Sequence, residues 1–389
     1  MEQLVQEIHA SAGQMVLSLS GGGSGALARL LEVPGGSRTL LEAVVPYSRG
    51  ALERWIGGVP DAFCSQATAR AMAMAAFLRA REYRPEGIDL AGVACTAGLT
   101  TDRPRRGEHR IHVAVQTAAT TVTWSLQLDK GRRTRAEEER LASELVLEAV
   151  AEACGVECRS PLDLSQDEHV ERRATVAPQP WRDLLLGNVE SVACGKATAE
   201  AILPGAFNPM HAGHRRMAQI AAEVLGVGVS LEISIVNVEK PPLDYHEIER
   251  RMGQFAEQPV CQPVCQPVCQ PVCQPVCQPV WLTRAATFVE KSRLFHGATF
   301  IVGTDTLRRI ADERYYGDDP SACRAALERI AGRGCRFLVF ARNPGTGLIR
   351  LSDLDLPDVL RSICREIPPE RFREGVSSTE IRRSTVRRS

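Results

Sequence analysis

Two histidines three residues apart, His211 and His214, lie in the stretch ILPGAFNPMHAGHRRM over residues 202–217. An apolar run and a Gly-Ala-Phe-Asn-Pro turn precede them, and helical periodicity begins near His214. The N-terminus of a helix favours anions, because its first N–H groups lack helical partners and its dipole is positive there. Imidazole N–H groups at that point predict electrostatic stabilisation of a phosphate that gains charge in the transition state.

The histidine pair has two other interpretations, a metal site and a structural turn. A catalytic zinc ion requires a third protein ligand, and HAGH lacks the glutamate of a helical H-E-x-x-H motif. We therefore assign no metal ligands. The structural interpretation would compete if the motif stood alone in the chain.

A second polar motif, GVSSTEIRRS, lies near the end of the chain at residues 375–384. Its hydroxyl side chains, those of Ser377, Ser378 and Thr379, can cap a helix and bind phosphate oxygens. Arg382 follows one helical turn later and would reach the same anion. By itself the segment could equally be an ordinary capping box.

Together, GAFNPMHAGH and VSSTEIR resemble the nucleotidyltransferase superfamily, which is marked by an H-x-G-H turn and an S-S-T-x-[IL]-R segment in a Rossmann-like domain. The resemblance covers about residues 198–385. It implies that His211 and His214 are catalytic and bind the triphosphate. The other residues for which it implies nucleotide or phosphate binding are Gly205, Phe207, Gly213, Lys240, Gly303, Asp305, Ser377, Ser378, Thr379 and Arg382.

Three positions in this domain leave questions open. Lys240 occupies the place of a phosphate-binding basic residue, but a solvated loop lysine is an equally good interpretation. Ala206 stands where the family often has Ser or Thr, and Asn208 where it often has Asp. These two departures bear on the acceptor substrate more than on the chemistry.

The resemblance implies a direct displacement at phosphorus. A phosphate-bearing acceptor attacks the α-phosphorus of a nucleoside triphosphate, pyrophosphate leaves, and Mg²⁺ bound with the nucleotide bridges phosphate oxygens. We expect ATP as donor and nicotinate or nicotinamide mononucleotide as acceptor. The alternatives are a cytidylyltransferase, a phosphopantetheine-type adenylyltransferase, and a nucleotide-binding sensor or scaffold without turnover.

The first 154 residues resemble the CinA-type nicotinamide-nucleotide amidase domain. ARLLEVPGGSRTLLEAVVPYS carries a V-P-G-x-S segment, and FCSQATARAMA and DLAGVACTAGLTTDRPRRGEHRIHVAV follow in that family's order. Ser20 falls where the family has its nucleophile, Tyr47 matches the family tyrosine, and Leu52 replaces the expected lysine. Because a serine nucleophile needs a base or a lowered pKa, we expect a vestigial amidase site with lost or reduced activity.

The glycine run SGGGSG, residues 20–25, has two open interpretations: an anion-binding loop or a flexible turn. The fusion of the two domains indicates pyridine-nucleotide (NAD) metabolism, since the amidase family acts on a mononucleotide that H-x-G-H enzymes adenylylate. This step is an analogy between families, and a fold does not fix a substrate.

The chain of 389 residues predicts two α/β domains. Helical and strand-like segments alternate over residues 1–154, and a polar, proline-bearing linker is expected over 155–197. Residues 198–389 again alternate, with short apolar strands typical of a doubly wound parallel sheet. Five copies of Gln-Pro-Val-Cys and a partial sixth interrupt this domain at 258–280, and a proline every fourth residue predicts an extended surface loop.

Composition limits the remaining function classes. Lys plus Arg and Asp plus Glu both total 47, so net charge favours neither a nucleic-acid nor a membrane partner. No run of eighteen apolar residues and no signal-peptide pattern is present, so we expect a cytoplasmic protein. Of 13 cysteines, five belong to the repeat and the others are scattered as in reduced proteins, although a metal-binding repeat is an alternative. Whether the protein is a homo-oligomer is left open by the sequence.

Overall fold

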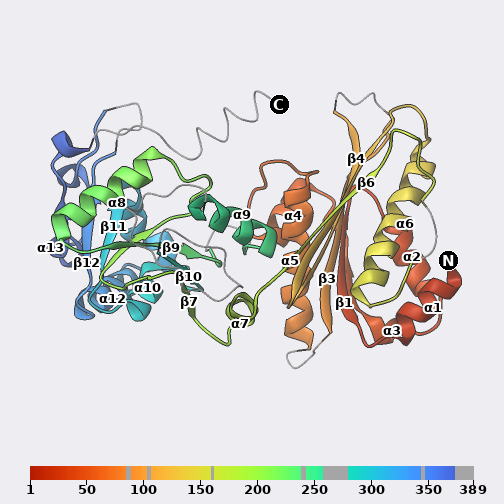
Figure 1. Ribbon diagram of the computed structural model, residues 1–389, viewed down its shortest axis with the longest axis horizontal. Coiled ribbons are helices and arrows are strands. Elements are labelled where there is room, and N and C mark those ends of the chain that lie inside the picture. Colours follow the sequence, from red (N-terminus) through yellow and green to blue (C-terminus); the bar gives the residue numbers. More distant parts are fainter. Residues whose placement is uncertain are drawn as a thin grey trace. The chain divides into compact units, whose positions relative to one another are not determined.

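The computed structural model describes residues 1–84, 89–102, 107–158, 162–237, 242–256, 279–342 and 347–372. The chain divides into two compact units, one of Met1–Arg182 with Glu239–Glu247, the other of Asp183–Val238 with Ile248–Ser389. Each unit has its own sheet flanked by helices (Figure 1). The predicted fold class, two α/β domains, is thereby confirmed.

The first unit is built on a six-stranded mixed sheet in the order β2-β1-β3-β4-β5-β6. β1 pairs in parallel with β2 and β3, and the pairs from β3 to β6 are antiparallel. All nine residues of β3 are buried, because helices cover both faces of the central strands. The strands are β1 Gln14–Ser20, β2 Leu40–Val44, β3 Leu90–Gly98, β4 His109–Thr117, β5 Thr120–Leu128 and β6 Val170–Val176.

Helices α4 and α5 cover one face of this sheet, and α1, α2 and α6 cover the other (Figure 1). Apolar side chains alternate in direction along each strand, so each face supplies its own core. Trp124 is the largest fully buried side chain on the α6 side. The helices are α1 Glu2–Ala10, α2 Ser24–Glu32, α3 Gly36–Thr39, α4 Arg49–Ile56, α5 Gln66–Tyr83 and α6 Arg135–Ala153.

The second unit has a seven-stranded sheet in the order β13-β12-β11-β8-β9-β10-β7. Six strands are parallel, and numbered from β8 along the chain they have the 3-2-1-4-5-6 order of the Rossmann fold. Edge strand β7 is antiparallel to β10. The strands are β7 Ser191–Cys194, β8 Ala201–Pro204, β9 Val229–Ser234, β10 Val280–Thr283, β11 Thr299–Gly303, β12 Arg336–Phe340 and β13 Cys364–Glu366.

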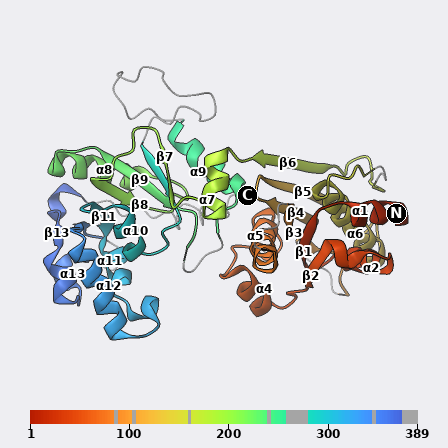
Figure 2. The same cartoon turned by 90° about the horizontal axis from the view of Figure 1, so that it is seen from below.

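Helices flank this second sheet, and α8 packs against β8, β9 and β11 (Figure 2). The first residues of α9 are assigned to the first unit and the remainder to the second. The α-helices are α8 Ala212–Leu225, α9 Tyr245–Ala256, α10 Phe288–Leu294, α11 Thr304–Ile310, α12 Pro320–Gly332 and α13 Asp358–Ser362. Single 3-10 turns are η1 Glu313–Tyr316, η2 Leu351–Asp353 and η3 Pro369–Arg371.

Residues 155–197, for which the sequence predicts a linker, contain ordered elements instead. β6 pairs with β5 in the first sheet, α7 (Gln179–Leu186) follows, and β7 pairs with β10 in the second sheet. β6 is an edge strand in which four consecutive residues, Glu171 to Ala174, are exposed. An edge strand with so little apolar content has the polar composition of a linker, which explains the difference.

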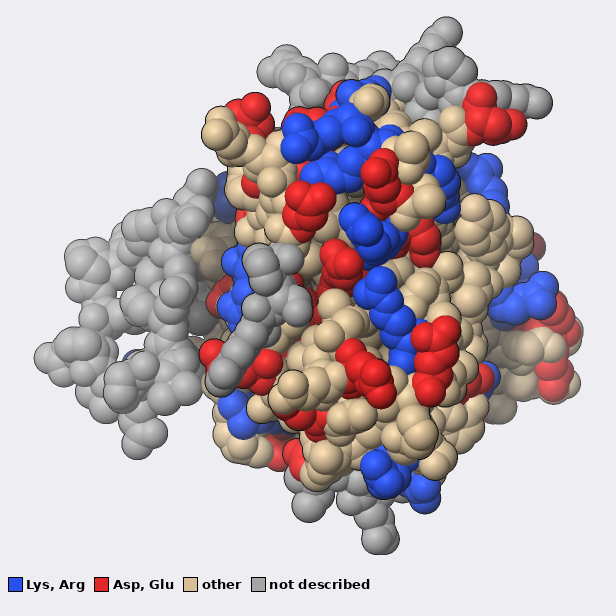
Figure 3. Space-filling model, turned by 90° about the vertical axis from the view of Figure 1, so that its right-hand side faces the viewer, with Lys and Arg blue, Asp and Glu red and all other residues tan. Residues whose placement is uncertain are grey.

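Acidic and basic side chains alternate on the molecular face shown in Figure 3, so this face has no single-sign patch. Within the described ranges, no helix has the length and apolar character needed to cross a membrane.

Candidate functional site

The two loops that the sequence assigns to phosphate binding follow neighbouring strands. β8 lies beside β11 at the position where the strand order reverses, and β8 leads into the histidine turn while β11 ends at Gly303. In an open parallel sheet, ligands bind outside the carboxyl ends of the strands at this switch point. The topology therefore brings the histidine turn and the Gly303 loop to one ligand-binding edge.

His211 is the N-cap of α8, so the helix begins at Ala212, two residues earlier than the sequence predicts. The rings of His211 and His214 stack with centroids 3.8 Å apart. The His211 backbone N–H donates to Nδ1 of His214 at 3.3 Å. In the neutral ring this leaves the proton on Nε2, where it can be donated to a ligand oxygen.

His214 is held in its neutral form. Burial lowers its pKa most, and the neighbouring His211, Arg342 and Arg215 lower it further, to about 3. The imidazole therefore acts as a directed hydrogen-bond donor in the ligand-free protein. Gly213, the second residue of α8, is buried in the same first turn.

The buried side chain of Phe207 packs against the histidine turn. Its side chain is 1% exposed and lies edge-on to His214 at 5.1 Å and to Phe255 at 5.9 Å between centroids. A Cβ at Gly205 would lie only 2.7 Å from the Phe207 ring, so glycine is required there. Gly205 and Phe207, which the sequence assigns to nucleotide binding, thus shape the turn, and their ligand contacts would be through the backbone.

Helix α9 fixes the backbone of the turn within the second unit. Arg251, 7% exposed, donates from Nη1 to the carbonyl of Ala206 at 2.9 Å. Gln254 donates to the carbonyl of Phe207 at 3.1 Å and accepts from the N–H of Met210 at 2.8 Å. These bonds satisfy the polar backbone of an irregular turn and hold its shape. The helical period of residues 246–257 is visible in the sequence, but this function of its polar face is not.

The second loop brings Asp305 and Arg342 to the same edge. Arg342 follows β12, and its Nε lies 3.4 Å from Oδ1 of Asp305. A Cβ at Gly303 would lie 2.5 Å from Oδ1 of Asp305 and 3.1 Å from Nε of Arg342. Gly303 is thus the position that lets both side chains approach the strand end.

Arg342 is a candidate phosphate-binding residue that sequence analysis missed. Its charge acts on His214, which places it at the histidine turn. The only signal in the sequence is a basic residue directly after the apolar run RFLVFA. The strand order places β12 beside β11, so a basic residue directly after β12 lies near the Gly303 loop.

A buried ion pair joins helix α10 to strand β9. Lys291 donates to both carboxylate oxygens of Glu232 at 2.7 and 2.8 Å and to the carbonyl of Ala285 at 2.8 Å. Thr283 also donates to Glu232, whose backbone carbonyl accepts from the N–H of Gly205 at 2.9 Å. The pair thereby supports the start of the histidine turn from β9 and α10.

Five predicted binding residues and the repeat lie outside the described residues. They are Lys240, Ser377, Ser378, Thr379, Arg382 and nearly all of the repeat at 258–280. Among the described residues, no group of three His, Cys, Asp or Glu side chains could hold a metal ion.

The first unit has a separate cavity of about 500 Å³ at the carboxyl ends of β1 and β3. Ser20 and Tyr47, the predicted vestigial amidase residues, both line it, as does Leu52. Ser20 donates to the carbonyl of Pro46 at 3.2 Å, while Tyr47 is 68% exposed. The structure therefore brings these residues to one cavity, in which Leu52 offers no base.

The glycine run is a packed turn in which the carboxylate of Glu139 accepts from the N–H groups of Ser24 and Gly25. The N–H and the hydroxyl of Ser24 donate to one carboxylate oxygen of Glu139 at 2.6 and 2.8 Å, and the N–H of Gly25 lies at 3.4 Å. A Cβ at Gly21 would lie 2.1 Å from the carbonyl of Ala97. The geometry disfavours an anion-binding loop, since the carboxylate of Glu139 already accepts from these donors, and the packed glycines differ from the flexible turn that was the other interpretation.

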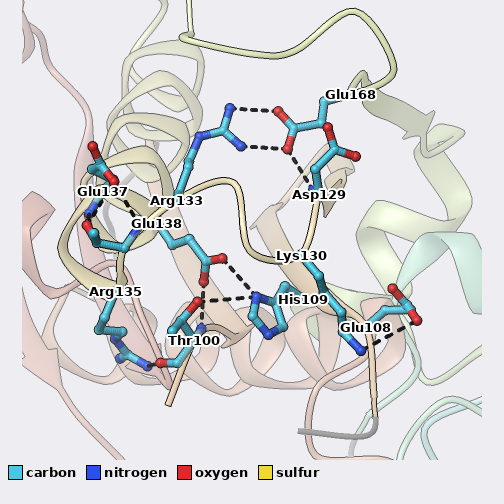
Figure 4. A network of polar contacts seen from close by, with 11 residues as sticks. Thr100, Glu108, His109, Asp129, Lys130, Arg133, Arg135, Glu137, Glu138 and Glu168 are labelled. Carbon is cyan, nitrogen blue, oxygen red and sulfur yellow. Dashed lines mark hydrogen bonds and ion pairs between the residues drawn. The ribbon is translucent and has the colours of Figure 1, made fainter. Parts of the chain in front are cut away.

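A polar network joins α6 to the strand ends next to the residues that line this cavity (Figure 4). Glu138, fully buried, accepts from the N–H of Thr100 at 2.6 Å and lies 2.8 Å from Nδ1 of His109. Arg135 donates to the carbonyls of Gly21 and Thr100 at 3.0 and 3.2 Å. Helix α6 thereby holds the ends of β1, β3 and β4 together.

Comparisons with known proteins give separate matches for the two parts of the chain. Residues 202–384 match the family model described as cytidylyltransferase-like, so the chain contains a cytidylyltransferase-like domain there. Such a domain supports a nucleotidyltransferase-type function and implies nucleotide binding. No curated protein matches the chain.

Solved structures similar to the N-terminal part come from the CinA superfamily. A competence/damage-inducible protein from Agrobacterium tumefaciens is 20% identical, with 39% of this chain and 94% of that chain covered and a TM-score of 0.31. A CinA superfamily protein from Escherichia coli is 14% identical, with coverages of 39% and 85% and a TM-score of 0.29. A competence or damage-inducible protein from Enterobacter asburiae is 14% identical, with coverages of 40% and 94% and a TM-score of 0.31.

Proposed function

We propose that the second unit transfers an adenylyl group from ATP to a phosphate-bearing acceptor, nicotinate or nicotinamide mononucleotide, with release of pyrophosphate. The observation that carries this proposal is the meeting of His211, His214, Asp305 and Arg342 at the switch point of the sheet. These groups are hydrogen-bond donors and charges, which suit phosphoryl chemistry that proceeds by positioning and electrostatic stabilisation.

Each residue has a defined role in this reaction. The N–H groups at the start of α8 and the Nε2–H of His214 bind phosphate oxygens, and His211 stabilises the pentacovalent phosphorus from the N-cap position. Arg342 adds a guanidinium charge. Its attraction to the leaving pyrophosphate strengthens as that group becomes more negative. Gly303 and Asp305 face the nucleotide, and the Ser377–Thr379 segment with Arg382 holds the β- and γ-phosphates. Lys240 is a further phosphate contact in this proposal.

Mg²⁺ would enter with the nucleotide. The described residues at the edge offer one carboxylate, Asp305, which is 53% exposed as a side chain. A single carboxylate fits Mg²⁺, which keeps several waters and binds mainly through substrate phosphates. When bound, it neutralises charge on the triphosphate oxygens.

The joining of the two domains in one chain supports a pyridine mononucleotide as acceptor. The chain joins the cytidylyltransferase-like domain to a unit with the serine and tyrosine positions of a nicotinamide-nucleotide amidase. The amidase reaction itself would be lost, because Leu52, 2% exposed, lies in the cavity where the family has lysine. In this proposal the first unit would still bind a mononucleotide without deamidating it, and adenylyl transfer would be the activity of the chain.

The test is pyrophosphate release with Mg²⁺ from ATP or CTP, against nicotinate mononucleotide, nicotinamide mononucleotide and phosphopantetheine. Release with ATP and a pyridine mononucleotide, lost in His211→Ala, supports the proposal. Release with another pair would overturn the substrate and retain the chemistry. Absence of release from protein that still binds ATP would favour a nucleotide sensor. Ammonia release from nicotinamide mononucleotide would contradict the loss of amidase activity.

A further inference from the structure

Lys291 and Glu232, in the second unit, form an ion pair that is almost fully removed from solvent. Lys291 on α10 is 5% exposed, and Glu232 on β9 is 1% exposed. The ammonium group of Lys291 donates to both carboxylate oxygens of Glu232 and to the carbonyl of Ala285. These bonds use its three N–H donors, so Lys291 has none left for a ligand. Any effect of Lys291 on the reaction therefore acts through the residues that it holds.

Stability alone does not account for a buried pair of this kind. Two charges lose their hydration on burial, and their mutual attraction offsets this cost only when their hydrogen bonding is complete. Well-packed apolar side chains of similar volume often stabilise a protein interior equally well or better. The bonds of the pair differ from apolar contacts in being directional, since they fix both the distance and the angle between the atoms they join. The pair is thus better suited to positioning the backbone than to adding stability.

The pair joins three segments that leave the sheet at its ligand-binding edge. Thr283, the last residue of β10, donates to the carboxylate of Glu232. Two residues later, the carbonyl of Ala285 accepts from Lys291. The backbone carbonyl of Glu232 accepts from the N–H of Gly205, which follows β8, at 2.9 Å. Glu232 is therefore bonded through its carboxylate to β10 and α10, and through its backbone to the histidine turn.

The histidine turn has little room to absorb a shift of Gly205. A Cβ at Gly205 would lie 2.7 Å from the ring of Phe207, so the backbone already approaches that ring closely. The ring lies edge-on to His214, with 5.1 Å between centroids, and His214 stacks on His211. Bonds from α9 hold the turn farther along, at the backbone of residues 206–210. A movement at Gly205 therefore reaches His214 through Phe207.

We propose that Glu232 and Lys291 are positioning residues, which set the place of Gly205 and through it the geometry of the histidine pair. The expected effect on turnover rests on the proposed function, whereas the effect on the turn does not depend on any reaction. A displacement of about 1 Å at reacting groups can lower a rate about 10²-fold. Loss of the pair should lower kcat more than it raises KM for ATP, because other groups at the edge still bind the triphosphate.

The first experiment replaces the pair in the full chain with apolar side chains, as Glu232→Leu together with Lys291→Met. Both charges are removed at once, so the midpoint of thermal unfolding should stay within about 5 °C of the parent. We expect kcat for pyrophosphate release to fall about 10- to 100-fold. A stable double variant with the parental kcat would overturn the proposal.

A milder variant covers the case in which the double variant does not fold. Thr283→Val keeps the shape of the side chain and removes one hydrogen bond to Glu232. We expect kcat to fall about 2- to 10-fold, as the loss of one hydrogen bond predicts. A folded Thr283→Val protein with unchanged kcat would also contradict the proposal.

Arg293→Gln together with Glu190→Gln is the matched control. This ion pair also connects α10 to another part of the second unit, but both of its side chains are more than half exposed. An exposed pair contributes little, so this variant should match the parent in unfolding midpoint and in kcat. An equal loss of kcat in the control would mean that any disturbance of α10 impairs turnover, and it would contradict a specific role of the buried pair.

Hydrogen exchange tests the positioning role without any reaction. Amide exchange of the full chain without nucleotide is followed by mass spectrometry in peptides covering residues 202–214 and, for comparison, β11. We expect exchange about 10-fold faster at residues 202–214 in the double variant and unchanged exchange in β11, because exchange reports local opening. Unchanged exchange at residues 202–214 would overturn the proposal. If this difference is found but the parent releases no pyrophosphate with any substrate pair, the proposed function fails and the positioning of the turn stands.

Discussion

The rings of His211 and His214 stack 3.8 Å apart at an interplanar angle of 30°. Such close stacking of two imidazoles is compatible with neutral rings and unfavourable for two imidazolium ions, because like charges at this separation repel. Burial and this neighbouring ring together hold the pKa of His214 at about 3. The pair is therefore built to donate hydrogen bonds to an anion that arrives with its own negative charge.

His211→Ala should abolish most turnover while the protein stays folded. Loss of one preorganised donor to a developing charge lowers kcat about 10²- to 10³-fold. We expect this loss in pyrophosphate release, with a smaller change in KM for ATP. His296→Ala is the matched control, since His296 is exposed on the same unit. A kcat within a few-fold of the parent would show that His211 is structural.

Arg342→Gln should weaken the same reaction. A hydrogen bond to a charged group contributes about 1.5–3 kcal/mol, so kcat/KM for the triphosphate should fall about 10- to 100-fold. Arg336→Gln changes an exposed arginine at the other end of β12 and should leave kcat/KM unchanged. Equal effects of both substitutions would indicate a general charge effect and contradict a role at the site.

Gly205→Ala should distort the histidine turn. The added methyl group would lie 2.7 Å from the Phe207 ring, and that ring is packed against His214 and Phe255. Overpacking of this kind costs about 1–3 kcal/mol, and we expect a lower midpoint in thermal unfolding with reduced turnover. Gly228→Ala is the comparison, because nothing lies within 4 Å of its added Cβ. If both variants melted like the parent, the turn would be more plastic than this packing indicates.

The sequence predicts the regular elements of the site because they carry periodic patterns. The apolar strand before residue 205 and the helix after His211 are visible as patterns, and so is the glycine after the central strand at 298–303. What places the two loops together is the strand order, which depends on long-range pairing. Local patterns contain no information on that pairing.

Contacts between residues distant in sequence explain the other differences. The carboxylate of Glu139 accepts from the N–H of Ser24 in the glycine turn, although the two residues are 115 positions apart. The local sequence of the turn therefore does not show whether its N–H groups are free for an anionic ligand. Arg342 reaches Asp305 across 37 residues by the same kind of long-range packing. The short edge strands β6 and β7 gain their hydrogen bonds from partners elsewhere in the chain, and their own composition predicts a linker.

The Arg133–Glu168 pair should make the first unit sensitive to acid. Glu168 is buried and accepts from both Nη atoms of Arg133 at 2.6 and 2.7 Å. Burial alone would raise the pKa of Glu168, but bonds from Arg133 and from the N–H groups of Asp129 and Ser165 lower it to about 2. Because the pKa of Glu168 is lower in the folded than in the unfolded protein, its ionised form stabilises the fold above the unfolded pKa of about 4.5. This stabilisation is lost as the pH falls toward 2.

Glu168→Gln tests this contribution by calorimetric unfolding across a pH series. The substitution leaves the buried Arg133 charge without its carboxylate, so we expect a loss of about 3–5 kcal/mol near pH 7. The difference from the parent should shrink between about pH 4.5 and 2, because protonation removes the same charge from the parent's Glu168. Glu171→Gln changes an exposed carboxylate three residues away and should match the parent. A difference that stayed constant down to pH 2 would mean that shape, and not the charge of Glu168, stabilises this loop.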